Sequence, residues 1–265
     1  MVSIKTLTKE QLTIDFNPEA YEKLLGKYEE LTDFLPLLHD FIADLEKNKD
    51  LYNINPYQEA FNKGIYILGK DDSTLDIFPS PKLALKCSEG YFGAEDVKKQ
   101  FHRIIQLTQE FATKLDAEER SLLQICPVYF HVQIRQANSF FKQIMFMEKV
   151  ADGVTLGHTE AGFNEDFCRV FNIPSLEEIR SKPQFDLHRH LDKNKHRQLL
   201  KIQTVYLFKR LLHKGIKICS LNQKNVLVSH VPETGQTKYI IIDPTEDFFP
   251  PLSPLYNSLT YQMCT

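Results

Sequence analysis

Residues 211–244 constrain the fold of this chain more than any other stretch, and they read LLHKGIKICSLNQKNVLVSHVPETGQTKYIIIDP. Gly215 follows several basic residues, a composition typical of the C-terminal end of a helix. Residues 226–228 and 239–242 are apolar runs typical of buried strands, and a segment with proline and glycine separates them. The stretch therefore predicts the end of a helix, a polar loop, and a β-hairpin that finishes at Asp243.

Length and charge exclude several classes of protein. The chain has 265 residues, which is enough for one two-lobed domain or two small domains. A formal net charge of -3 argues against a nucleic-acid binder that acts by neutralising phosphates. We find no run of about 18 apolar residues that would span a membrane. The first residues also lack the apolar core of a secretory signal.

The cysteine pattern indicates a reducing environment. The five cysteines are dispersed, odd in number and form no CxxC pair. They are Cys87, Cys126, Cys168, Cys219 and Cys264. Dispersed free thiols are typical of cytosolic proteins. We expect a cytoplasmic protein or a secreted effector that acts in the reducing cytosol of a host, and the sequence does not distinguish the two.

Residues 1–55 predict a helical N-terminal extension. Asn17, Pro18 and Glu19 supply an N-cap, a favourable first helical residue and an acid near the positive helix end. Apolar residues then recur at helical spacing up to residue 45, with an interruption at Pro36. This stripe fits either a helix packed on its own domain or a docking surface for a protein partner. The pattern alone does not separate these alternatives.

Residues 56–148 alternate between strand signals and a helix signal. Residues 94–115 carry apolar side chains at helical spacing. Residues 128–134 alternate apolar and polar side chains, which predicts a half-buried strand. Three further apolar runs predict strands at 65–68, 82–86 and 142–147. Together with the later hairpin, these segments predict an α+β fold.

In this order, the segments resemble the protein-kinase-like superfamily. The motifs that carry the resemblance are LALK at 83–86, FMEKVADG at 146–153, and LHKGI followed by Asn225 and IIDP. The resemblance covers roughly residues 57–247. It implies a two-lobed fold with an N-lobe at 56–148 and a short C-lobe at 149–265, preceded by the helical extension.

The resemblance also implies a site for ATP with Mg²⁺ or Mn²⁺. Asn225 and Asp243 match the residues that hold the metal, and Lys86 matches the lysine that contacts the phosphates. Glu110 is the expected partner of Lys86 on the helix, and Glu95 is the alternative. Each of these acids fits a solvated helix face equally well. Lys86 alone would also fit an ordinary strand end.

The segment at 146–153 resembles the hinge that binds adenine in kinases. Met147 takes the gatekeeper position, and the backbone from Glu148 to Val150 would contact the base. A strand that simply ends in a glycine turn would give the same pattern. Its position between the lysine strand and the hairpin favours the hinge.

The sequence departs from the kinase pattern at the catalytic loop. Aligned on Asn225, the position of the catalytic Asp holds Ser220. A neutral hydroxyl cannot accept the substrate proton as a carboxylate does, and general bases contribute about 10²–10⁴-fold to rate. The glycine-rich loop is also poor, because Glu59 and Phe61 occupy two of its glycine positions when Gly64 takes the third. The tail after Asp243 is too short for an activation segment and further helices.

Two functions from different classes therefore remain. The first is a pseudokinase, a kinase-like nucleotide-binding module that regulates or scaffolds a protein partner. The second is an active atypical ATP-dependent phosphotransferase, or a transferase of another nucleotide-derived group, with an acid supplied from elsewhere. An unrelated α+β protein with a chance motif is the third reading.

The histidines near residue 190 do not predict a metal site. His188, His190 and His196 lie in a charged segment without the Cys/His spacing of a zinc site. We interpret them as surface histidines.

Overall fold

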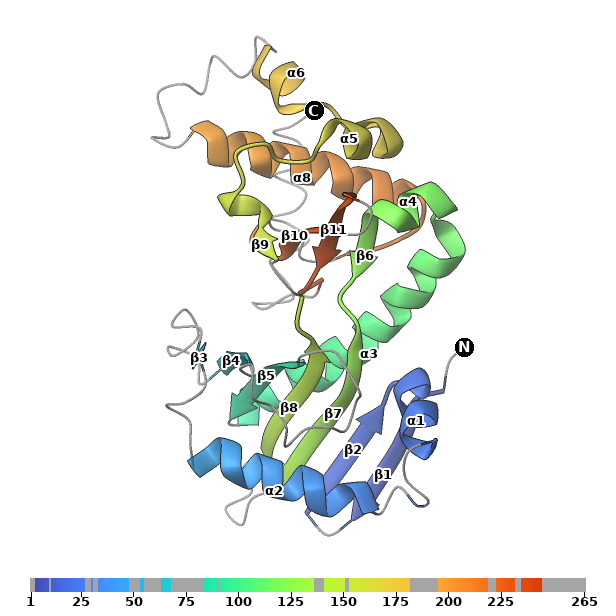
Figure 1. The fold of residues 1–265 in the computed structure, drawn as a ribbon, viewed down its shortest axis with the longest axis vertical. Helices are drawn as coiled ribbons and strands as arrows, with labels where there is room; N and C mark the ends of the chain where they lie inside the picture. The colour runs from blue at the N-terminus through green and yellow to red at the C-terminus, as the bar shows by residue number, and fades with distance from the viewer. Residues whose placement is uncertain are drawn as a thin grey trace. The chain divides into compact units, whose positions relative to one another are not determined.

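A computed structural model describes residues 3–9, 11–26, 30, 33–47, 53–54, 63–67, 83–89, 91–135, 141–150, 153–181, 195–218, 223–231 and 235–244. The chain divides into two compact units, shown in Figure 1. The first unit comprises Met1–Gln106 and Pro127–Lys149, and the second comprises Leu107–Cys126 and Val150–Thr265. Helices and sheets occur in both, so the predicted α+β class is confirmed. The kinase-like lobe arrangement stays a prediction.

The first unit is built on a seven-stranded sheet with the order β1-β2-β7-β8-β5-β4-β3. All of its neighbouring strands are antiparallel. The strands are β1 (Lys5–Lys9), β2 (Leu12–Phe16), β3 (Asn53–Ile54), β4 (Lys63–Ile67), β5 (Leu83–Glu89), β7 (Val128–Arg135) and β8 (Phe141–Glu148). The expected helical extension is wrong for its first part, because β1 and β2 form a hairpin that joins the sheet beside β7.

Helices α1 (Pro18–Leu25) and α2 (Phe34–Lys47) cover one face of this sheet (Figure 1). As expected, Asn17 caps α1 by accepting a hydrogen bond from the Glu19 N–H at 3.0 Å. Pro36 lies in the first turn of α2, where its missing N–H costs no helical hydrogen bond.

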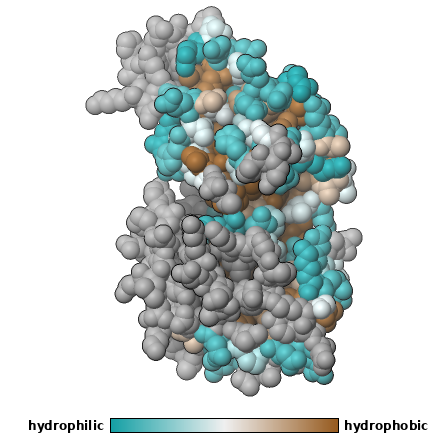
Figure 2. All heavy atoms as spheres, viewed as in Figure 1, coloured by the Kyte–Doolittle hydropathy of each residue, from teal (hydrophilic) through white to brown (hydrophobic). Residues whose placement is uncertain are grey.

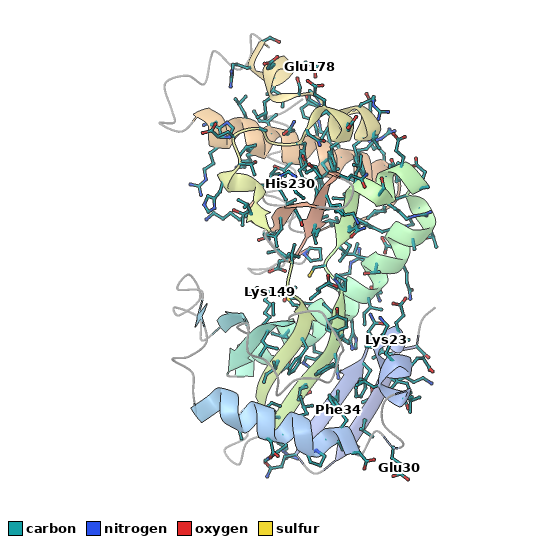
Figure 3. All side chains as sticks on the ribbon, viewed as in Figure 1. Lys23, Glu30, Phe34, Lys149, Glu178 and His230 are labelled. Atoms are coloured by element: carbon teal, nitrogen blue, oxygen red, sulfur yellow. The ribbon has the colours of Figure 1, made fainter. Side chains whose placement is uncertain are left out.

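Aromatic side chains form the core of this face. Phe34, labelled in Figure 3, is fully buried and packs edge-on against Phe130 with ring centres 5.6 Å apart. Phe130 also stacks on Phe146 at 4.2 Å. The sequence left open whether the apolar stripe of the N-terminal helices packs on its own domain or docks a protein partner. The buried part of this stripe packs on its own domain. Both helices contribute residues to the core of their own unit.

The opposite face of the sheet contacts α3 (Tyr91–Lys114), which confirms the helix predicted at 94–115. Contacts from Lys98, Phe101 and His102 on α3 reach β2, β7 and β8. The expected half-buried strand is wrong for β7, because residues 128–132 are all buried. His131 packs against Phe101 of α3, with ring centres 6.0 Å apart, instead of facing water.

The second unit contains a four-stranded sheet with the order β6-β11-β10-β9. These strands are β6 (Leu123–Ile125), β9 (Val154–Thr155), β10 (Val226–His230) and β11 (Thr237–Ile241), and β6 runs parallel to β11. The predicted hairpin is confirmed by the antiparallel pairing of β10 with β11. Besides the end of α3, the helices in the described residues of this unit are α4 (Ala117–Leu122), a 3-10 turn (Leu156–His158), α5 (Glu165–Phe171), α6 (Leu176–Ser181) and α8 (Lys195–His213).

Helix α8 ends with the motif that the sequence predicted. Gly215 has a φ of 73°, in the left-handed region. The Ile216 N–H donates to the Leu211 carbonyl and the Gly215 N–H donates to the Leu212 carbonyl, both at 2.9 Å. These two bonds are the Schellman pattern, which satisfies the last carbonyls of a helix and sets the direction of the following chain.

Hydrophilic residues predominate among the coloured residues on the face shown in Figure 2. The large hydrophobic residues exposed in the described ranges are Leu25, Val154 and Leu212, which lie on different elements. Within the same ranges, no helix combines the length and the hydropathy required to cross a membrane.

We expect Gly215→Ala to lower the free energy of unfolding by about 1–2 kcal/mol, because an L-residue is strained in the left-handed region. The added methyl group itself would meet only the Lys114 ammonium, at 3.6 Å. Gly26→Ala is the matched control, since Gly26 ends α1 at φ -71° with ordinary space around it. Denaturant unfolding of both variants checks this, and equal effects at the two glycines would contradict it.

Candidate functional site

Two of the predicted site residues meet at one end of the β10–β11 hairpin. Asn225 directly precedes β10, and Asp243 follows β11 after one residue. The Ile242 N–H donates to the Asn225 carbonyl at 2.9 Å, and Asn225 Nδ2 donates to the Asp243 carbonyl at 3.2 Å. Antiparallel pairing therefore brings together two residues that lie eighteen positions apart.

The orientation of the Asn225 amide follows from this bond. A carbonyl accepts only from a donor, so Nδ2 must face Asp243, and Oδ1 is the atom that takes no part in the contact. An amide oxygen and a carboxylate are both hard oxygen ligands, the type that Mg²⁺ and Mn²⁺ prefer. The residue types at this end of the hairpin thus fit a divalent cation.

The described residues contain no cluster of three or more His, Cys, Asp or Glu side chains that could hold a metal by themselves. A cation beside Asn225 and Asp243 would need further ligands from a bound molecule or water. Mg²⁺ is commonly held in this way, by one or two carboxylates together with substrate phosphates. Asn225 and Asp243 therefore suit a metal that arrives with a nucleotide better than a permanently bound structural metal.

Lys86 occupies a buried position on β5. Its side chain is only 4% exposed, which is rare for lysine because the ammonium loses water of hydration. It lies directly opposite Met145 on β8, whereas Met147 lies opposite Ala84 and is also buried. The strand register therefore places Lys86 and Met147 on the same face of the sheet, since the side chains of residues 145 and 147 share a face.

The other predicted contacts are placed as follows. Glu110 belongs to the second unit, and its carboxylate lies 3.6 Å from the Lys114 ammonium on the next turn of α3. Glu148 ends β8 and accepts a hydrogen bond from the Tyr129 hydroxyl at 3.1 Å. Its N–H donates to the Pro127 carbonyl at 2.9 Å, so a ligand contact by its backbone would use the carbonyl. Val150, two residues after the strand, is half-buried.

Several predictions fall outside the described residues. Ser220, the substituted catalytic position, is one of them, as are the expected loop positions Glu59 and Phe61. Gly64 lies in β4 opposite Cys87. His196 has an ordinary structural contact, with Nε2 2.8 Å from the Thr159 carbonyl.

The sequence reasoning missed a group of charged residues on the α3-facing side of the first sheet. Asp15 of β2 is 2% exposed and His131 of β7 is fully buried. Asp15 lies opposite His131, and the Thr6 hydroxyl donates to Asp15 Oδ1 at 2.7 Å. The only signal available in the sequence was the polar position of His131 within an apolar alternation, which the prediction assigned to solvent.

Three side chains that can carry positive charge converge on this carboxylate. Lys98 Nζ lies 3.2 Å from Asp15 Oδ2, His131 Nδ1 lies at 3.4 Å and His102 Nε2 lies at 3.7 Å. Gln143 of β8 supports the arrangement. Its Oε1 accepts from the Lys98 backbone N–H at 3.1 Å and lies 2.9 Å from His131 Nε2.

The hydrogen-bond pattern defines the proton positions on His131. Gln143 Oε1 accepts from Lys98, which fixes it as the amide oxygen, so His131 Nε2 must carry a proton to bond it. The other ring nitrogen faces the Asp15 carboxylate. It lies 3.4 Å from Asp15 Oδ2 and makes no hydrogen bond with it.

These contacts control the ionisation of Asp15. Burial by itself raises its pKa, but the interactions with His131, Thr6 and Lys98 outweigh that effect and hold the pKa well below its ordinary value of 3.8. His102 shows the opposite balance. Burial lowers its pKa, although the Asp15 charge partly opposes the change.

No protein-family model matches this chain, and a search of curated proteins finds no significant match. The functional interpretation therefore depends on the residues and their geometry.

We expect Asp15→Asn to lower the free energy of unfolding by roughly 2–4 kcal/mol at neutral pH, because it removes the buried carboxylate charge that faces Lys98 and His131. Asp40→Asn is the control, since the Asp40 side chain is 85% exposed. A loss no larger than in the control would show that the carboxylate contributes little.

The same carboxylate predicts a pH dependence. The folded pKa of Asp15 is depressed, so its contribution is complete above the ordinary value of 3.8 and is lost as the pH falls from there towards the folded pKa. In acid, the stability of the wild type should therefore decrease more steeply than that of Asp15→Asn. Denaturant unfolding between about pH 6 and pH 2 measures the difference, and parallel curves would contradict the assignment.

Proposed function

We propose that this protein is a kinase-like nucleotide-binding module that acts as a pseudokinase, regulating or scaffolding a protein partner. Its ligand is ATP with Mg²⁺ or Mn²⁺. The single observation that carries the proposal is the meeting of Asn225 and Asp243 at the end of the β10–β11 hairpin, with the Asn225 amide bonded to the Asp243 backbone.

The chemistry of this pair favours a nucleotide-bound metal. Phosphoryl-transfer proteins use the cation mainly to neutralise phosphate oxygens, so an Asn–Asp pair with few other ligands suits a metal that arrives with the nucleotide. Lys86 would add a positive charge for the phosphates. This role comes from the resemblance of LALK to the lysine strand of kinases.

Ser220 is the reason for proposing a pseudokinase. Without a carboxylate at that position, the protein would bind the nucleotide but transfer phosphate slowly. The alternative is an active atypical phosphotransferase or a transferase of another nucleotide-derived group. The retained set of Lys86, Asn225 and Asp243 favours it, because positioning and charge neutralisation provide most of the catalysis in phosphoryl transfer.

ATP with Mg²⁺ should raise the melting temperature of the wild type, whereas ATP with EDTA should have a much smaller effect. A ligand at a hundred times its dissociation constant stabilises the native state by about 2.7 kcal/mol. Asp243→Asn should abolish the metal-dependent part of the rise in melting temperature, and it preserves the size of the side chain. A thermal-shift titration up to about 5 mM ATP measures this effect.

Glu160→Gln is the control for this titration, because Glu160 is an exposed acid in the same unit as Asp243. It removes one negative charge without changing the hairpin. A metal-dependent shift that persists in Asp243→Asn, or no shift in the wild type, would contradict the proposed site.

Restoring the missing carboxylate tests the pseudokinase proposal directly. If Ser220 occupies the position of the base, Ser220→Asp should raise ATP turnover by about 10²–10⁴-fold over a low wild-type rate. The rate is measured as release or incorporation of labelled γ-phosphate. Adding Asp243→Asn to this variant should remove the gain.

Ser3→Asp, an exposed serine elsewhere in the chain, is the matched control. Rapid turnover by the wild type that Ser220→Asp does not increase would favour the active transferase with an acid from another position. If the wild type turns over ATP slowly and Ser220→Asp gives no increase, Ser220 does not occupy the position of the base.

A further inference from the structure

Strand β1 lies at one end of the seven-stranded sheet, beyond β2 (Figure 1). Its five residues pair with β2 on one side, from Lys5 opposite Phe16 to Lys9 opposite Leu12. Among the described residues, no strand pairs with its other side. An edge strand presents a row of unpaired backbone N–H and C=O groups, so this side can accept a further strand.

The hydrogen bonds of β2 show which backbone groups of β1 point outward. In an antiparallel sheet, successive residues direct their N–H and C=O groups to opposite sides of the strand. The Arg135 N–H donates to the Gln11 carbonyl, and the Asn17 N–H donates to the Tyr129 carbonyl, both at 2.9 Å. The odd-numbered residues of β2 between Gln11 and Asn17 therefore bond β7, and the even-numbered ones bond β1.

The register between the two strands then assigns the residues of β1. Lys5, Leu7 and Lys9 lie opposite the even-numbered residues of β2 and bond them. Thr6 and Thr8 alternate with these three, so their N–H and C=O groups point away from β2. Both threonines are exposed, and no described residue bonds these four backbone groups. They form a short row of donors and acceptors at the open edge.

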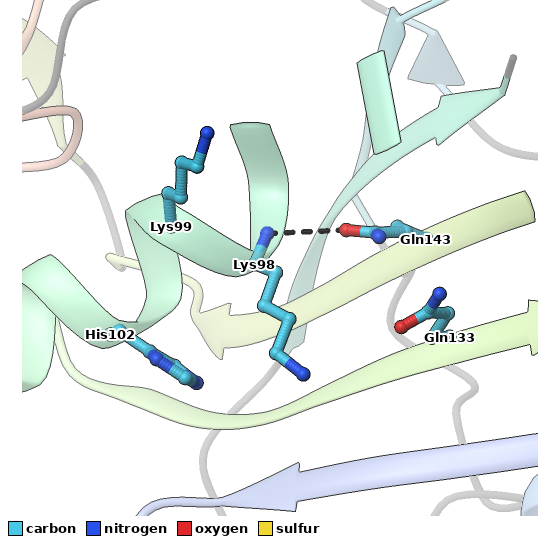
Figure 4. Close-up of a pocket in the computed structure, with 5 residues that line it drawn as sticks. All are labelled: Lys98, Lys99, His102, Gln133 and Gln143. Atoms are coloured by element: carbon cyan, nitrogen blue, oxygen red, sulfur yellow. Dashed lines mark hydrogen bonds between the residues drawn. The ribbon is translucent and has the colours of Figure 1, made fainter. Parts of the chain in front are cut away.

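Contacts on both faces of the sheet hold β1 in this position. On the face covered by α1 and α2, Leu7 packs against the aromatic core. On the other face, the Thr6 hydroxyl donates to Asp15 Oδ1 at 2.7 Å. Asp15 in turn faces Lys98 of α3, whose backbone N–H bonds Gln143 of β8 (Figure 4). The edge is therefore preformed, which reduces the entropy lost when another strand joins it.

The charge of β1 indicates the kind of strand that suits the edge. Lys5 is exposed, and its ammonium lies 5.9 Å from the centre of the Tyr21 ring, which carries no charge to neutralise it. The sequence of β1, KTLTK, reads the same in both directions. A second copy paired antiparallel about Leu7 would therefore place lysine opposite lysine at both ends, which is unfavourable. An acid opposite each lysine is favourable.

We propose that the open edge of β1 binds an extended acidic segment of a protein partner by strand addition. Hydrogen bonds to Thr6 and Thr8 would anchor the backbone of the segment in an antiparallel arrangement. Acids opposite the two lysines and an apolar side chain opposite Leu7 give its sequence preference, acid–x–apolar–x–acid. That the segment belongs to a regulated partner rests on the proposed function, whereas its binding to the edge needs no nucleotide.

The probe is the fluorescent peptide Thr-Glu-Thr-Val-Thr-Glu-Thr with blocked termini, titrated with the whole chain and followed by anisotropy. The control peptide has lysine in place of both glutamates. The glutamate peptide should bind saturably, and the lysine peptide at least about tenfold more weakly, because the attractive cross-strand pairs become repulsive. Lys5→Glu should weaken binding of the glutamate peptide and strengthen that of the lysine peptide, an exchange that loss of structure alone would not produce.

Thr8→Pro tests the backbone contact. It removes an N–H that bonds no described residue, and proline is compatible with an edge strand at such a position. Binding of the glutamate peptide should weaken by at least about tenfold. Thr8→Val is the matched control, because it keeps the N–H and the branched side chain, and its binding should stay within about twofold of the wild type. Asp243→Asn should bind the peptide as the wild type does, which separates this surface from the nucleotide site.

A second measurement does not depend on the variants folding. In the wild type, the glutamate peptide should slow hydrogen exchange of the Thr6 and Thr8 amides, since each N–H gains a partner. The amides of Leu7 and Lys9 are already bonded to β2 and should change less.

Three results would overturn the proposal. One is equal binding of the two peptides, and another is binding by Thr8→Pro as tight as that by Thr8→Val. The third is a dimer of the wild type that Thr8→Pro dissociates, which would assign the edge to a second copy of the chain.

Discussion

The buried charge of Asp15 is the constraint on which the first unit depends. A carboxylate with almost no solvent needs compensating interactions: Lys98 of α3 supplies a positive charge, and His102 of α3 and His131 of β7 also face the carboxylate. These contacts join a residue near the N-terminus to a helix and to a strand far along the chain. Lys98 and His131 also contact Gln143 of β8, through the Lys98 backbone N–H and His131 Nε2, so α3 is attached to the sheet beside the charge network.

The two faces of this sheet differ in composition and in what they contribute to the fold. One face carries an aromatic and aliphatic core under α1 and α2, which provides hydrophobic stabilisation. The other face carries polar groups that stabilise less but hold specific geometry. Lys86, the residue expected to contact nucleotide phosphates, belongs to this second face. Lys86, His131 and Asp15 thus share one face of the sheet.

In the second unit, backbone pairing sets the positions of the candidate site residues. The hairpin of β10 and β11 fixes Asn225 beside Asp243, and the Schellman motif at Gly215 sets the direction of the chain that leads towards it. Neither feature needs a large buried area. The hairpin holds Asn225 and Asp243 together through backbone and side-chain hydrogen bonds.

The amino-acid sequence was sufficient to predict the local elements: the caps of α1 and α8, the helix at 94–115, and the hairpin that brings Asn225 towards Asp243. These depend on interactions between near neighbours, so periodicity and turn residues were sufficient. Tertiary structure alone decided that β1 and β2 extend the sheet, and that His131 is buried against Asp15. Those outcomes depend on pairing between residues more than a hundred positions apart, and alternation along one strand does not reveal whether water or a helix covers its polar side.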